Sequence, residues 1–145
     1  MKSIDNANFL CYGIVESTRR MEGVSILLKK KLTHDDVKNY IQNLKDLREE
    51  VHHKIQEVAH RPEHEDIHDL LHKKLELLKF IEKQIFMLTG EEYEVARLML
   101  DNAPYKVSVK HFWERYEKGE SSFNRRKKEV VEKVMHQCNQ YLEAM

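Results

Sequence analysis

The sequence predicts an all-α protein, and three observations favour this fold class. Only four Gly and two Pro occur among 145 residues, whereas sheet proteins need many turns and therefore more of both residues. Charged residues make up 34% of the chain and apolar residues 41%. Apolar residues also recur at intervals of three and four, which is the spacing of one helix face. We expect a helical region over residues 1–88, with a long antiparallel hairpin at 33–88, and a three-helix helix-turn-helix domain over 89–145.

The first element is expected over residues 5–32. Gly13 and Gly23 weaken its helical pattern and leave open whether it is one bent helix or two short ones. A second helix is predicted over 33–58. Thr33 can cap its first turn by accepting a hydrogen bond from a free N–H group, and the two acidic residues shortly after it suit the positive end of the helix dipole.

The second helix should end at Arg61 and Pro62, because proline lacks a backbone N–H and disfavours helical geometry in the residue before it. Another helix is predicted over 63–88. Two long helices joined by so short a turn should pack antiparallel, either within one chain or as part of a homodimer. The residues expected to form this contact are Leu44, Leu47, Val51, Leu70, Leu77 and Ile81.

Three shorter stretches follow the break at Thr89-Gly90. A helix is expected over 91–102, closed by Ala103-Pro104. The segment 108–134 then predicts two helices, because apolar residues at helical spacing are interrupted by a polar stretch at 117–120 that contains a glycine. This layout of two helices and a short turn is typical of a helix-turn-helix.

The last helix should begin at a cap formed by Ser121 or Ser122 and extend to about Ala144. Its predicted inward residues are Phe123, Val130, Val131, Val134, Cys138 and Leu142. The residues left on the outward side of its first turns are Ser121, Ser122, Asn124, Arg125 and Lys128. Arg and Asn side chains can bond base edges in two places at once, while Lys and Ser can hold phosphates, so this face is a candidate nucleic-acid interface.

The formal net charge is zero, with 25 basic and 25 acidic residues, so no overall charge draws the protein to nucleic acid or membrane. The charge is unevenly distributed, however. Residues 104–128 contain eight Lys and Arg against three Glu, whereas 89–103 contain one Arg against four acids. We expect Trp113 and Tyr116 in the core rather than as platforms for base stacking. The candidate DNA-binding residues are Ser121, Ser122, Asn124, Arg125, Arg126, Lys128, Lys106 and Lys110.

Residues 88–134 resemble the promoter-reading helix-turn-helix of sigma factors, in which two apolar anchors lie eleven positions apart, as Phe112 and Phe123 do here. A helical region followed by such a domain is similar to phage late-gene transcription activators of the RinA and ArpU type. The family usually has a small residue where Trp113 stands and Gly where Glu117 stands, and this chain differs at both positions. The resemblance implies a DNA-binding transcriptional regulator encoded by a phage or mobile element. It places residues 121, 122 and 124–126 on the recognition helix.

The sequence leaves two alternatives to DNA binding. In the first, the hairpin docks onto a protein and the C-terminal helices only complete the bundle, as in an adaptor or inhibitor. RNA polymerase or another regulatory protein is the expected class of protein partner. In the second, the protein is an enzyme, which we do not expect because no Gly-rich phosphate loop or nucleophile-base pair is discernible. We expect no cofactor.

A His-Glu-x-x-His pattern at residues 64–68 matches the zinc-binding motif of some proteases, in which two His bind the metal and Glu activates water. We do not expect a catalytic site or a bound metal, since the pattern lies at the tip of the hairpin and lacks a third ligand. A wider stripe consists of four histidines spaced four residues apart, which are His60, His64, His68 and His72. It leaves open metal binding or a proton-sensitive patch, against the simpler interpretation of a solvated polar face.

The two cysteines, Cys11 and Cys138, lie far apart on apolar stretches, and we expect buried, reduced thiols. The first twenty residues do not have the pattern of a signal peptide, because acidic residues interrupt a short apolar run. No stretch approaches the roughly 18 apolar residues that a membrane span needs. A cytoplasmic protein without membrane contact is therefore expected.

Overall fold

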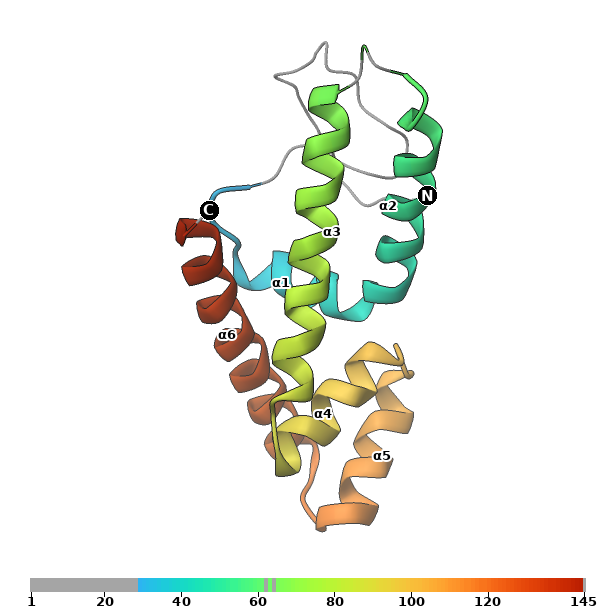
Figure 1. Cartoon of the computed structure of the whole chain (residues 1–145). Coiled ribbons are helices and arrows are strands. Elements are labelled where there is room, and N and C mark those ends of the chain that lie inside the picture. The colour runs from blue at the N-terminus through green and yellow to red at the C-terminus, as the bar shows by residue number, and fades with distance from the viewer. Residues whose placement is uncertain (1–28, 62, 64, 145) are drawn as a thin grey trace. The chain divides into compact units, whose positions relative to one another are not determined.

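The computed structural model describes residues 29–61, 63 and 65–144, and every element in these ranges is a helix (Figure 1). The all-α prediction is therefore confirmed for this part of the chain. The helices are α1 (His34–Gln42), α2 (Leu44–Val58), α3 (Glu65–Phe86), α4 (Gly90–Leu100), α5 (Tyr105–Tyr116) and α6 (Glu120–Ala144). Most of the element predicted over residues 5–32 lies outside the described residues.

The chain divides into two compact units whose segments alternate along the sequence. Among the described residues, unit 1 comprises Lys29 and Lys45–Leu78, and unit 2 comprises Lys30–Leu44 and residues 79–144. Unit 2 thus contains the helix-turn-helix region together with α1 and the end of α3, although α1 and α3 were predicted as parts of the hairpin region.

The helix predicted as continuous over 33–58 is wrong, because the chain breaks at Asn43 into α1 and α2. Asn43 leaves helical geometry, with φ −118° and ψ 19°. Its side-chain amide donates to the backbone oxygen of Asn39 at 3.0 Å and to the side-chain oxygen of the same residue at 2.8 Å. A short amide side chain that bonds the backbone in this way competes with continued helix, which explains the break.

The predicted start of α1 is confirmed by a capping box. The Thr33 hydroxyl accepts from the backbone N–H of Asp36 at 3.2 Å, and the Asp36 carboxylate accepts from the backbone N–H of Thr33 at 2.9 Å. Two N–H groups that the helix leaves without an intrahelical acceptor are satisfied reciprocally.

In unit 1, α2 and the first part of α3 run in opposite directions, as expected for two helices with a short connection (Figure 1). Their buried apolar residues follow the predicted spacing of three and four, with the exception that Leu70 is only partly buried. The buried set of this unit is Leu47, Val51, Val58, Ile67, Leu71, Leu75, Leu77 and Leu78.

In unit 2, the long helix α6 packs against α1, α4 and α5, and α4 also contacts α1 and α5. Five of the six inward residues predicted for α6 are buried, and Leu142 is partly exposed. Asn139 joins the start of α1 to the far end of α6. Its side-chain oxygen accepts from the backbone N–H of Leu32 at 2.7 Å, and its side-chain nitrogen donates to the backbone oxygen of Leu32 at 3.1 Å.

Cys138 is a buried free thiol in the apolar face of α6, as predicted, and burial raises its pKa to about 12. The protonated thiol is therefore a packing group rather than a nucleophile at neutral pH. Cys11 lies outside the described residues. Among the helices that the structure describes, none combines the length and the apolar character needed to cross a membrane.

Candidate nucleic-acid interface

The pairing of α5 with α6 depends on two aromatic anchors, Phe112 and Phe123, which are 0% and 2% exposed. Their ring centroids lie 5.6 Å apart with the planes inclined at 64°, an edge-to-face geometry that aromatic pairs prefer. Tyr105, at the start of α5, also meets the Phe123 ring edge-on at 6.1 Å. The two anchors that the sequence singled out by their spacing thus join the two helices.

The turn between the helices contains a left-handed residue. Glu117, the C-cap of α5, has φ 56° and ψ 38°, and its N–H donates to the backbone oxygen of Trp113 at 2.7 Å. The carbonyl of Gly119 accepts from the N–H of Phe123, so Gly119 rather than a serine precedes the first turn of α6. The prediction that Ser121 or Ser122 caps α6 is therefore wrong, since the helix has already begun at Glu120.

The left-handed conformation of Glu117 gives a testable expectation. A residue with a side chain is strained in this conformation by about 1–3 kcal/mol in the folded state. Replacing it with Gly removes that strain but costs about 0.4–1 kcal/mol of stability, because Gly gives the unfolded chain more conformational entropy. Glu117→Gly should therefore raise the free energy of unfolding by roughly 1 kcal/mol, measured by urea denaturation. Glu117→Ala is the matched control, because it removes the same carboxylate but keeps the strain. Equal stabilisation by both variants would assign the effect to charge.

The first turns of α6 present the predicted outward residues. Ser121, Asn124, Arg125 and Lys128 are exposed, and Ser122 is half-buried. The Asn124 amide donates to the Tyr105 hydroxyl at 2.9 Å, so its orientation is already fixed by α5. The Tyr105 hydroxyl in turn donates to the Glu120 carboxylate, and that bond raises the pKa of Tyr105.

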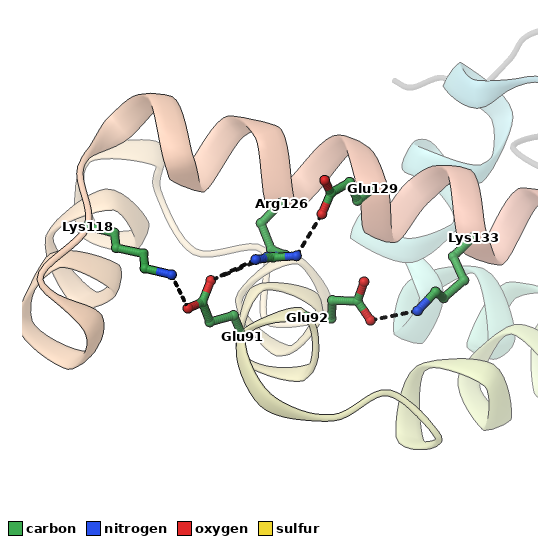
Figure 2. A network of polar contacts seen from close by, with 6 residues as sticks. All are labelled: Glu91, Glu92, Lys118, Arg126, Glu129 and Lys133. Atoms are coloured by element: carbon green, nitrogen blue, oxygen red, sulfur yellow. Dashed lines mark hydrogen bonds and ion pairs between the residues drawn. The ribbon is translucent and has the colours of Figure 1, made fainter.

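Arg126, which was predicted as a recognition residue, is held within unit 2 by ion pairs (Figure 2). Its guanidinium donates to Glu91 of α4 at 3.1 and 3.3 Å and to Glu129 at 2.7 Å. Lys118 of the turn also donates to Glu91, at 2.6 Å, and Lys133 pairs with Glu92 at 2.8 Å. A carboxylate in the first turn of α4 therefore forms ion pairs with some of the basic residues of segment 104–128.

This network lowers the pKa of Glu91 below its ordinary value of 4.5. The hydrogen bond from Lys118 is the largest cause, burial opposes it, and the bonds and charge of Arg126 add to it. Because the folded-state pKa is the lower one, the pairs stabilise unit 2 at neutral pH. That stabilisation is lost as the pH falls below 4.5 and Glu91 becomes protonated.

The outer face of α5 differs from the expectation in one residue. Trp113 was predicted in the core, yet it is 56% exposed, because Ser108 and Phe112 take the inward positions of this helix. Tyr116 is half-buried beside Phe112, at a centroid distance of 5.2 Å. Lys106 and Lys110 are both exposed.

One basic residue of segment 104–128 is partly buried rather than exposed. Lys127 is partly buried on the side of α6 that faces α1, and burial followed by the charge of Lys38 lowers its pKa. It contributes to the lining of a cavity of about 120 Å³ together with Ser108 and Phe123. Lys127 is one of the eight basic residues of segment 104–128, but its partly buried side chain packs within unit 2 instead of adding to the exposed charge.

The histidine pattern at 64–68 is only partly described, since His64 lies outside the described residues. His68 and His72 are neighbours one turn apart on α3, with ring centroids at 4.5 Å. Within the described residues, no group of three or more His, Cys, Asp or Glu side chains is arranged to hold a metal ion.

No protein-family model, no curated protein and no solved structure matches this chain.

Proposed function

We propose that this protein is a sequence-specific DNA-binding transcriptional regulator of the kind encoded by phages or mobile elements, which reads duplex DNA with the first turns of α6. One observation carries the proposal. Arg125 and Lys128 are exposed about one turn apart, and neither forms an ion pair with a described residue, while the adjacent Arg126 is occupied by Glu91. Two cations left free on one face of a helix suit an anionic partner.

On this face of α6, different side chains would contact the bases and the phosphates. Arg125 has the planar donor set that bonds guanine in two places, and Lys128 suits a phosphate. Asn124 is held by Tyr105 through its amide nitrogen, which leaves its oxygen free to accept. Lys106 and Lys110 of α5 would bind phosphates beside the groove, since the first helix of such a pair crosses the DNA backbone.

The proposal predicts that Arg125→Ala/Lys128→Ala weakens binding to duplex DNA without loss of helicity. Loss of a bidentate base contact costs about 1–3 kcal/mol, and each phosphate contact contributes about 0.9 to the dependence of log affinity on log salt. Fluorescence anisotropy with labelled genomic fragments at several salt concentrations measures both effects. Lys73→Ala/Lys83→Ala is the matched control, because it removes two exposed positive charges from α3.

Arg126→Ala should behave differently from the Arg125 variant. Its loss removes the bonds to Glu91 and Glu129, so the melting temperature should fall even without DNA. If the wild type binds no genomic fragment above background at low salt, the regulator proposal is rejected.

A second function is supported by an exposed cluster at the end of α3. Phe86 is 52% exposed and Met87 65%, and the Arg97 guanidinium lies over the rings of Phe86 and Tyr93 at 6.0 and 5.9 Å. Aromatic residues, Met and Arg are the types enriched in protein interfaces. The alternative is therefore a helical interaction module that binds a regulatory protein or RNA polymerase without contacting DNA. A pull-down with and without nuclease distinguishes the two, because only a directly bound protein survives digestion of the DNA.

A further inference from the structure

The exposed face of α5 combines an aromatic ring with two cations. Lys106, Lys110 and Trp113 occupy positions i, i+4 and i+7, which lie on one face of a helix. Both lysines are exposed and form no ion pair or hydrogen bond with a described residue, and Trp113, the single tryptophan of the chain, is 56% exposed. The acidic residues of α5 and its C-cap, Glu114 and Glu117, lie near Trp113 in the sequence, while Glu94 of α4 pairs with His111 at 3.4 Å. At the start of α5, Glu120 accepts a hydrogen bond from the Tyr105 hydroxyl.

We propose that this face of α5 binds single-stranded nucleic acid, with a base stacked on Trp113 and phosphates on Lys106 and Lys110. An exposed indole ring offers a flat surface for any base, and lysines one turn apart can follow a phosphate backbone. The two features are found together in sites that bind single strands with little sequence preference.

The choice of a single strand follows from the geometry of stacking. In a duplex, each base is already stacked on its neighbours, so its ring face is closed to an indole. Stacking on Trp113 therefore avoids the cost of unstacking only when the base comes from an unpaired strand. Duplex reading by α6 depends on Arg125 and Lys128 of another helix, whereas Lys106 and Lys110 would serve the phosphates of either form and Trp113 only the single strand.

A protein partner is less well supported at this face. Protein interfaces bury a contiguous apolar centre from which charged residues are depleted. On α5, the row that holds Trp113 has lysines at two of its other positions and Glu117 at its end. Val107 and Tyr105 are the other exposed large apolar residues of α5, but they lie outside this row, so the row itself offers one stacking ring between charges.

The single tryptophan makes a direct test practical, because all indole emission of the full-length protein reports Trp113. We expect an oligothymidylate of about 8 nucleotides to quench this emission in a saturable manner at low salt. A longer mixed-sequence duplex, which stays paired at low salt, should quench it much less. Rising salt should weaken the effect, since phosphate contacts release counterions.

Variants separate the ring from the charges. With a fluorescein-labelled oligothymidylate, Trp113→Ala should weaken binding about tenfold or more, and Trp113→Phe should restore most of the affinity. Lys106→Gln/Lys110→Gln should lower the slope of log affinity against log salt by about 1.4, because each single-strand phosphate contact contributes about 0.7. Lys73→Gln/Lys83→Gln, which removes the same charge from α3, should leave the slope unchanged.

Two results would overturn the inference. One is an affinity for the oligothymidylate that is equal in Trp113→Ala and wild type. The other is an emission that the oligothymidylate leaves unchanged. Arg125→Ala/Lys128→Ala keeps this test distinct from the proposed function, because that variant should lose duplex binding and retain quenching by the single strand.

Discussion

Phe123→Ala is expected to lower the free energy of unfolding by about 3–5 kcal/mol, the usual cost of truncating a buried phenylalanine. The ring is 2% exposed and meets the edges of both Phe112 and Tyr105, so alanine would leave a cavity lined by two aromatic rings of α5. Urea denaturation followed by circular dichroism measures the loss. If α6 reads duplex DNA as proposed, the variant should also lose duplex binding, because α6 is aligned with α5 through this contact.

Trp113→Ala is the matched control for Phe123→Ala. It removes a larger aromatic side chain from the same helix pair, but one that is 56% exposed, so its effect on stability should stay within about 0.5 kcal/mol. Phe123→Leu should cost less than Phe123→Ala, since it fills most of the volume. A loss below about 1 kcal/mol in Phe123→Ala would show that the anchor assignment is mistaken.

Helical periodicity was sufficient to predict the all-α class and most of the described helices. The stripe of α6 from Phe123 to Cys138 and the capping residue Thr33 agree with the structure, because burial on one helix face and a free N–H at a helix start are local requirements. The break at Asn43 was missed for the opposite reason. The apolar spacing continues through it, and an asparagine can stop a helix without disturbing the pattern.

The candidate site could be predicted only in part, because charge counting along the chain ignores partners from other helices. Glu91 lies 35 residues before Arg126, yet it occupies that guanidinium, and no sequence signal indicated the pair. Trp113 was misplaced because it falls between inward positions of α5. It was expected in the core, but Phe112 already fills the space beside Phe123.

The second large effect is expected in unit 1, from Leu77→Ala. Leu77 is 0% exposed on α3 and Leu47 is 3% exposed on α2, so truncating either side chain should cost about 2–5 kcal/mol. Lys73→Ala, an exposed position on α3, should change stability by less than about 0.5 kcal/mol. Urea denaturation is the measurement for all three variants.

The same experiment tests whether these leucines serve one chain or two. Both are buried within a single copy of the protein, so the unfolding midpoint of wild type and of Leu77→Ala should not depend on protein concentration. A midpoint that rises with protein concentration would favour the alternative in which the hairpin helices form a homodimer. Near-neutral Leu47→Ala and Leu77→Ala would instead mean that this face is not core and is free to receive a partner.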